Sequence, residues 1–419
     1  MKIAIVGSGI AGLGCAWFLH QRHQVTVFEA DARVGGHSHT VVVDEDGADI
    51  PIDTGFMVYN EVTYPHLTRL FRELKVPTMP TAMSFSVHHG PSGVEWNGGG
   101  LSQLFGQRKN WLNLRHWRFL LQLKRFNSEA VAALDEPRWA PMSLGEYVEA
   151  RGYGRDFLER YLIPMSSAVW STPPQKMLEF PATTLLRFWH NHGFLGLNTQ
   201  HPWRTVVGGS RQYVERLIEP FRSRIHTSTP VQSARRAPDG VMVVSSRGEE
   251  RYDRLILASH APASLKMLDD PTPLEREILS CFEYQPNDVR LHTDERVMPQ
   301  VKRCWASWNY RTETGASTTH YWMNSLQRVS ERKNYFVSLN SADRLGPETC
   351  LRKLDYEHPL FDRTAIAAQN RLPELQQAGR ETHTYFCGAW TRYGFHEDGL
   401  LSAVNVAGHL LGGDPWTLR

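Results

Sequence analysis

Lys2-Ile-Ala-Ile-Val6-Gly7-Ser-Gly9-Ile-Ala-Gly12 is the stretch that decides the fold of this chain. Its apolar first part has the length of a strand and leads directly into a G-x-G-x-x-G turn. An apolar segment, Leu13–Leu19, follows as an expected helix, and a second strand, Val25–Phe28, ends on Glu29. A strand, a glycine turn, a helix and a strand that ends on an acid form the context in which this motif binds a dinucleotide. The sequence therefore predicts a Rossmann-like unit.

Each glycine of this unit has a physical task. Gly7 makes the tight turn, Gly9 lets a pyrophosphate approach the backbone, and Gly12 lets helix and strand pack closely. The helix N-terminus offers free N–H groups and a positive dipole end to phosphates. Glu29 lies 17 positions after Gly12, near the usual spacing for an acid that binds ribose hydroxyls. Ordinary turn glycines and a surface acid are the alternative, which the agreeing strand and helix contexts disfavour. The expected contacts are Gly7, Gly9, Ile10, Ala11, Gly12, Glu29 and Ala30.

A second glycine pair, Gly35-Gly36, lies just beyond the acid, between Arg33 and His37. A nicotinamide-binding domain has no obvious need for this pair. The arrangement resembles the glycine-doublet flavoproteins, which include amine oxidases, protoporphyrinogen oxidases and phytoene desaturases. This resemblance implies non-covalent FAD, with the doublet near its pyrophosphate and Arg33 balancing phosphate charge. The typical family segment has Arg where this chain has His37, so a permanent cation is not expected there.

The segment 41–60 reads as a hairpin followed by a close approach to the cofactor. Val41–Asp44 and Ala48–Asp53 are the two expected strands. In the flavoproteins that the chain resembles, the next segment passes beside the isoalloxazine ring. The resemblance implies that Thr54, Gly55 and Phe56 contact the cofactor and that Tyr59 lies near it. A strand end with an ordinary turn is the alternative.

The C-terminal region supplies a second motif. Thr384–Trp390 reads as a strand that contains Gly388, and a small-residue helix, Leu400–Gly408, follows a loop. This order resembles the closing motif of the same flavoproteins, in which the helix start directs N–H groups at the flavin. A helix N-terminus stabilises the negative charge that a reduced flavin carries. The contacts implied are Gly388, Asp398, Gly399, Leu400 and Leu401.

The resemblance also divides the chain into two interleaved domains. With 419 residues, the chain is too long for one simple core. The strands expected over 225–258 resemble the three-stranded insert of these flavoproteins, in which the residue matching Val231 contacts the adenine through its backbone. We expect an α/β fold, with a Rossmann-like FAD-binding domain formed by 1–63, 204–262 and 384–419. The remaining segments, 64–203 and 263–383, are expected to form an α+β substrate domain.

Composition excludes several classes of protein. The formal net charge is only +2, which gives no global field for nucleic acid. Five scattered cysteines without C-x-x-C spacing predict neither a disulfide framework nor a zinc site, and they fit a reducing cytoplasm. No metal is expected. The first strand begins at Lys2, and no apolar run has the length of a membrane span. A cytoplasmic protein is expected; its oligomeric state is left open.

The stretch 101–126 is unusual because bases alternate with Trp and Leu. No acid occurs between Glu95 and Glu129. Such a composition is typical of a basic amphipathic helix on an anionic membrane surface, here the inner membrane face. The alternative is an ordinary helix pair that packs Trp and Leu inward and leaves its bases in solvent. The six bases are Arg108, Lys109, Arg115, Arg118, Lys124 and Arg125.

Aromatic residues in the middle of the chain indicate an apolar pocket. Trp170, Phe188 and Phe194 are the expected lining, which suits an oily substrate. The segments 168–173 and 394–399 resemble a bacterial branch of predicted NAD/FAD-binding proteins linked to fatty-acid modification. This resemblance implies a fatty-acyl or lipid-like substrate and a dehydrogenation or desaturation.

The chemistry requires a proton acceptor, and three residues are our candidates: His396, Glu397 and Tyr59. Two other functions stay open. One is a flavin oxidase of amines or other small molecules, which the lack of a recognisable flavin-side lysine disfavours. The other is a lipid or protein escort on the same scaffold, which the complete glycine sets disfavour.

Overall fold

A five-stranded parallel sheet contains the predicted N-terminal unit. The computed structural model describes residues 1–196, 199–314 and 316–419. The strand order is β10-β2-β1-β14-β20. The strands are β1 (Lys2–Val6), β2 (Gln24–Phe28), β10 (Ile225–His226), β14 (Arg254–Leu257) and β20 (Thr384–Phe386). The sheet therefore combines three segments that lie far apart in the sequence.

Two helices pack together beside this sheet. The helix α1 (Ile10–Leu19) is buried along its whole length, as its continuous apolar sequence predicts. The small residues of α16 (His396–Leu411) allow close contact, because a Cβ on Gly14 would lie only 3.0 Å from the Cβ of Ala403. The two helix starts are thereby held next to the glycine turn.

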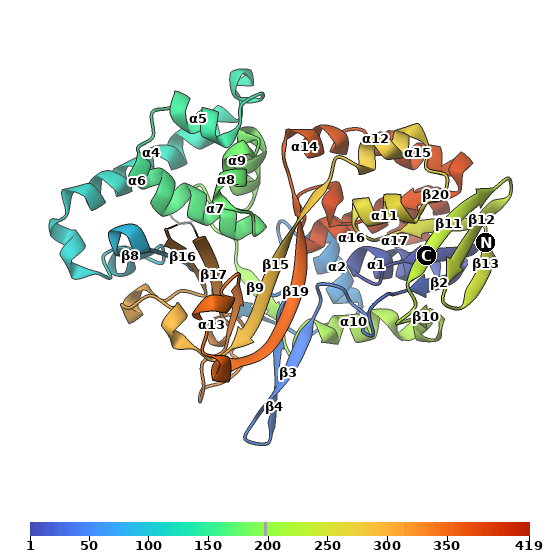
Figure 1. The fold of residues 1–419 in the computed structure, drawn as a ribbon, viewed down its shortest axis with the longest axis horizontal. Coiled ribbons are helices and arrows are strands. Elements are labelled where there is room, and N and C mark those ends of the chain that lie inside the picture. The colour runs from blue at the N-terminus through green and yellow to red at the C-terminus, as the bar shows by residue number, and fades with distance from the viewer. Residues whose placement is uncertain (197–198, 315) are drawn as a thin grey trace.

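The expected three-stranded insert forms a separate antiparallel sheet, β11-β12-β13. Its strands are β11 (Val231–Ala237), β12 (Gly240–Ser245) and β13 (Gly248–Tyr252). Figure 1 shows this sheet at the right edge of the molecule, near both chain termini.

A seven-stranded sheet, β19-β15-β18-β17-β16-β7-β8, dominates the other half. Its strands pair antiparallel except β16 and β7, which are parallel. The remaining strands form two small sheets, the predicted hairpin β3-β4 and the sheet β5-β9-β6. The bounds are β3 (Thr40–Glu45), β4 (Ala48–Asp53), β5 (Tyr59–Asn60), β6 (Thr78–Thr81), β7 (Phe85–His89), β8 (Val94–Asn97), β9 (Trp203–Val206), β15 (Glu283–His292), β16 (Trp308–Glu313), β17 (Ala316–Trp322), β18 (Phe336–Leu339) and β19 (Cys350–Leu360).

Helices between residues 101 and 191 form a layer at the end of the molecule opposite the termini (Figure 1). A capping box starts α5, where Ser143 and Glu146 exchange both hydrogen bonds. The elements are α3 (Leu101–Leu104), the 3₁₀ turn η2 (Arg108–Leu112), α4 (Leu114–Ala133), α5 (Leu144–Ala150), α6 (Arg155–Phe157), the π-turn η4 (Leu158–Leu162), α7 (Ile163–Trp170), α8 (Pro174–Glu179) and α9 (Ala182–Asn191).

The remaining helices cover the sheets or connect their strands. They are α2 (Pro65–Glu73), α10 (Arg211–Ile218), α11 (Ala261–Met267), α12 (Pro273–Leu279), α13 (Met323–Gln327), α14 (Arg363–Gln369), α15 (Leu372–Thr382) and α17 (Pro415–Leu418). Among the described residues, no helix has both the length and the apolar character to cross a bilayer. Nor does the described part of the chain contain a cluster of three or more potential metal ligands.

Candidate cofactor and active site

A cavity of about 1270 Å³ joins the glycine turn to the aromatic helices. This volume exceeds the roughly 300–1,000 Å³ of most small-molecule sites. Its walls come from the β1–α1 turn, the ends of β14 and β20, the strands β15 and β19, and the helices α7 and α9. One cavity therefore has room for a dinucleotide and a second molecule beside it.

The glycines at the first end of the cavity have three different roles. Gly7 has a positive φ of 104°, which favours glycine, and it lines the cavity. A Cβ on Gly9 would meet no protein atom within 4 Å. It would instead occupy the space in which a ligand can approach the backbone of Gly9. A Cβ on Gly12 would lie 1.9 Å from the Gly7 carbonyl oxygen, so Gly12 serves helix packing and does not line the cavity.

Glu29 lies at the cavity wall in a fixed orientation. Its Oε2 accepts hydrogen bonds from the backbone N–H and the hydroxyl of Ser8, at 2.8 and 2.5 Å. Its Oε1 accepts from the N–H of Asp31 at 2.9 Å. Ile10, Ala11 and Ala30 line the same end. This carboxylate is positioned to bind hydroxyl groups such as those of a ribose.

Two buried polar atoms at this end have no hydrogen-bond partner among the described residues: Arg33 Nη1 and His37 Nε2. The Nη2 atom of Arg33 donates to the Gly36 carbonyl oxygen at 2.6 Å. Burial lowers the pKa of His37 well below its ordinary value, so its ring is neutral at pH 7. Unpaired buried polar atoms are costly, and phosphate oxygens would accept from Arg33 Nη1 and from His37 Nε2 in the tautomer that carries its proton there. The residues present therefore fit a pyrophosphate.

The second glycine pair brings two motifs into contact. A Cβ on Gly36 would lie 3.0 Å from the Cα of Gly9, whereas Gly35 does not line the cavity. Gly55 and Phe56 line the cavity, but Thr54 does not. The Thr54 hydroxyl instead donates to the His39 carbonyl oxygen at 3.0 Å.

His396, the first residue of α16, lies at the cavity wall. Its ring stacks on Phe56, with centroids 4.0 Å apart. Its Nε2 lies 2.6 Å from the Tyr213 hydroxyl and 3.2 Å from the Ser38 hydroxyl. Burial lowers the pKa of His396 to about 3, so the imidazole is neutral at pH 7.

The other two candidate acids or bases lie elsewhere. Glu397 accepts hydrogen bonds from the N–H groups of His66 and Leu67, each at 2.9 Å, and thereby caps the start of α2. Tyr59 is buried against Phe71, with ring centroids 5.1 Å apart. Neither side chain lines the cavity. The geometry gives each side chain a structural contact, and a role of either as proton acceptor stays a prediction.

The closing motif is also used differently from the expectation. Gly388 lines the cavity, but its N–H donates to the Ser402 hydroxyl at 2.9 Å. Asp398 accepts from the N–H of Phe395 at 2.9 Å, and a Cβ on Gly399 would lie 2.7 Å from an Ile10 methyl group. The residues that shape the fold without lining the cavity are Asp398, Gly399, Leu400 and Leu401.

Val231 has no place in the cavity wall either. It begins β11 and lies buried in the core of the three-stranded sheet. Its side chain packs with apolar residues, as composition alone would predict.

Aromatic rings surround the far end of the cavity. The indole N–H of Trp170 donates to the Tyr393 carbonyl oxygen at 3.0 Å. Phe188 stacks on His192 and on Phe395, with centroids 3.9 and 4.9 Å apart. The three residues expected from the sequence all line this chamber, and no lysine is among the described lining residues. The chamber consists of Met83, Val169, Trp170, Phe188, His192, Phe194, Trp203, Trp308, Tyr321, Phe361, Tyr393 and Phe395.

Strand β19 contributes lining residues that the sequence reasoning missed. Six consecutive residues, 354–359, line the cavity, and Leu354, Tyr356 and His358 are half-buried among them. The Tyr356 hydroxyl lies 2.8 Å from both His39 Nδ1 and the Thr54 hydroxyl. A period of two between 350 and 360 is the signal that could have found this strand. Tyr213 and Ser38, which are the hydrogen-bond partners of His396, show no such signal in the sequence.

A family model described as flavin-containing amine oxidoreductase matches residues 10–411. The chain belongs to this family. The predicted glycine-doublet family and its two-part α/β fold are therefore confirmed, and the cofactor of the family is FAD.

Individual relatives are more distant. A Mycobacterium tuberculosis protein named as a flavin-containing monoamine oxidase, AofH, is 26% identical over 303 residues. The match covers 68% of this chain and 62% of the relative, so the chain matches less than two thirds of its length.

Solved structures of low identity share the fold. Cyclohexylamine oxidase from Brevibacterium oxydans superposes with a TM-score of 0.67 at 17% identity, over 98% of this chain and 99% of that one. A conjugated-linoleic-acid-producing fatty acid isomerase from P. acnes gives 0.67 at 15% identity, over 96% of both chains. At these identities the likeness concerns the fold alone.

Proposed function

We propose that this protein is an FAD-dependent oxidoreductase that removes a hydride from a hydrophobic substrate, a fatty-acyl or lipid-like chain. The observation that carries the proposal is the continuity of the cavity. The residues that fit a dinucleotide and the aromatic chamber share one space. A substrate in the chamber would lie next to the cofactor and away from water.

When bound, FAD supplies the hydride acceptor. Glu29 would bind ribose hydroxyls, and Arg33 would place a charge at the pyrophosphate. Trp170, Phe188 and Phe395 would hold the apolar chain and exclude water.

His396 is the residue that would take a proton from the substrate. Its imidazole is neutral, half-buried and located at the cavity wall. The Tyr213 hydroxyl and the stacked Phe56 ring hold the imidazole in place. The neutral ring has a lone pair that can accept a proton at pH 7, and its lowered pKa makes it a weak base there.

An oxidase of amines or other small molecules is the second candidate. The family description and the named relative favour it. Aromatic rings can also hold an ammonium group through cation–π contact. The escort function is less favoured, because the unpaired buried atoms Arg33 Nη1 and His37 Nε2 fit a bound cofactor.

Anaerobic titration of the flavin-loaded protein would distinguish these functions. Bleaching of the flavin absorbance by fatty acids or acyl lipids, but not by amines, is expected. Bleaching by amines alone would favour the oxidase. A protein that binds no FAD under any condition of reconstitution would contradict both redox functions.

A further inference from the structure

We propose that one face of the helical layer docks on an anionic lipid bilayer. This face, called here the basic–apolar face, belongs to the turn η2 and the helix α4. It consists of Arg108, Lys109, Trp111, Leu112, Leu114, Trp117, Arg118, Leu121, Lys124 and Arg125.

Helix geometry places the outward residues of α4 along one stripe. Residues 114, 117, 118, 121, 124 and 125 are all exposed, and their spacing of three or four residues lies on one helical face. The opposite stripe is buried and includes His116, Phe119, Phe126 and Ala130. An ordinary amphipathic helix has polar residues on its outer side. Here leucine and tryptophan occupy that side as well.

The exposure of the apolar side chains is unusually large. Leu112 is 93% exposed, Leu114 74%, and Leu121 64%. Trp111 is 49% exposed. Single exposed leucines are ordinary on protein surfaces, but a cluster of them with tryptophan marks an interaction site. The alternative of an ordinary helix pair with its Trp and Leu packed inward is therefore wrong for these side chains.

The positive charge of the basic–apolar face indicates an anionic partner. Arg115 pairs with Asp156, and Arg125 pairs with Glu129. Within the described residues, no carboxylate pairs with the other four bases, which are Arg108, Lys109, Arg118 and Lys124. Four unpaired cations among exposed leucines match lipid phosphates above an acyl layer. A purely apolar protein partner would leave these cations without compensation.

The face is rigid rather than a loose loop. Trp111 stacks on Phe105, with centroids 4.0 Å apart, and its carbonyl oxygen accepts from the indole N–H of Trp117 at 2.9 Å. The Asn113 side chain caps α4 by accepting from the N–H groups of Arg115 and His116. The anchor residues are thus preorganised, which lowers the entropy cost of docking.

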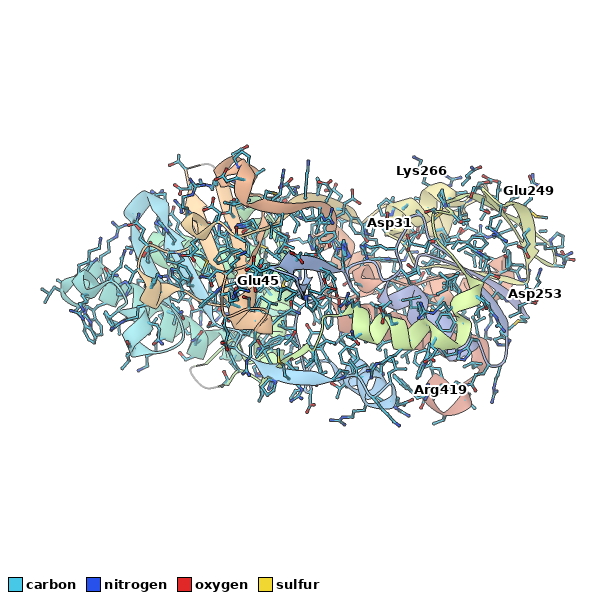
Figure 2. All side chains as sticks on the ribbon, turned by 90° about the horizontal axis from the view of Figure 1, so that it is seen from below. Asp31, Glu45, Glu249, Asp253, Lys266 and Arg419 are labelled. Carbon is cyan, nitrogen blue, oxygen red and sulfur yellow. The ribbon has the colours of Figure 1, made fainter. Side chains whose placement is uncertain are left out.

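The basic–apolar face lies at one end of the molecule, where it can reach a bilayer. In Figure 1, α4 lies at the left edge, far from both termini. Figure 2 shows Lys266, Glu249, Asp253 and Arg419 at the opposite end. That end provides exposed bases for a matched control.

Co-sedimentation of the full, flavin-loaded chain with vesicles tests the proposal. Wild-type protein should pellet with phosphatidylglycerol/phosphatidylcholine vesicles, and much less with phosphatidylcholine alone or in high salt. The double variant Arg118→Gln/Lys124→Gln should lose most of the binding to anionic vesicles, at least fivefold. The triple variant Leu112→Ser/Leu114→Ser/Leu121→Ser should lose binding while it keeps the bases.

The control is Arg235→Gln/Lys266→Gln, which removes the same charge from the opposite end and should bind like wild type. Far-ultraviolet circular dichroism and flavin content verify that each variant is folded. Wild-type protein that stays in the supernatant, or face variants that bind like the control, would overturn the proposal. A dimer in sedimentation velocity that the leucine variant dissociates would instead assign the face to a second copy of the chain.

Discussion

At the scale of single residues, the second and third glycines of the first motif separate binding from folding. Gly9 opens into the cavity, whereas Gly12 is enclosed by the Gly7 carbonyl group and Ala258. The motif alone does not distinguish these roles, since every glycine in it looks equivalent. The difference depends on what lies beside each Cα after folding.

Gly9→Ala should weaken FAD binding at least tenfold and leave the thermal stability of the apoprotein nearly unchanged, because its methyl group enters only ligand space. Gly12→Ala should lower the free energy of unfolding by at least about 2 kcal/mol, since a clash at 1.9 Å forces helix and strand apart. Flavin fluorescence titration and denaturant unfolding measure the two effects. Equal loss of stability in both variants would contradict this division.

His396 provides the second test at this scale. His396→Phe keeps the stack on Phe56 but removes the proton acceptor, so kcat should fall about 10²- to 10⁴-fold with FAD still bound. Tyr213→Phe, which only removes a hydrogen bond to Nε2, should have a smaller effect. Stopped-flow measurement of flavin reduction is the readout. An unchanged rate in His396→Phe would exclude this residue as the base.

At the scale of elements, the start of α16 joins three parts of the molecule. His396 faces the cavity, Glu397 caps α2, and Asp398 binds the backbone before its own helix. Consecutive residues at a helix start point in different directions, since each turns by about 100° around the axis. Three neighbouring polar residues therefore serve three functions.

Glu397→Gln should destabilise the protein by about 1–2 kcal/mol, because the amide retains only one acceptor for the N–H groups of His66 and Leu67. The exposed Glu219→Gln is a matched control that should change little. Chemical denaturation measures both variants. A Glu397→Gln protein with normal stability and much slower turnover would return this carboxylate to the chemistry.

At the scale of the whole molecule, buried neutral histidines link sheet stability to pH. His292 and His320 both lie 2.7 Å from the Ser338 hydroxyl within the seven-stranded sheet. Burial lowers the pKa of His292 to about 4 and that of His320 well below its ordinary value. The unfolded chain binds protons near pH 6.5, before the folded chain does.

The contribution of these two histidines to stability should therefore be complete above about pH 6.5 and fall as the pH decreases toward 4. In this window, each such histidine lowers the free energy of unfolding by up to about 1.4 kcal/mol for each unit by which the pH falls. Melting temperature measured from pH 7.5 to 4.5 should show the decline, and His292→Gln should make it shallower. A melting temperature independent of pH would contradict the neutral, buried state of these rings.

The sequence by itself determined the family, the cofactor and the Rossmann-like unit, because these depend on local order along the chain. A glycine turn, its strand and its helix are neighbours in sequence, and the apolar run of Lys2–Val6 leaves little choice of structure. The hairpin at 40–53 and the capping box at Ser143 are local in the same sense.

Only the tertiary structure decided which polar residues meet at the cavity. His396 meets Tyr213 and Ser38 across more than 180 residues of chain, and the β19 residues reach the cavity only by sheet pairing. It also decided that Leu112, Leu114 and Leu121 remain outside the core. Sequence periodicity shows that a helix has two faces, but burial depends on which neighbours cover them.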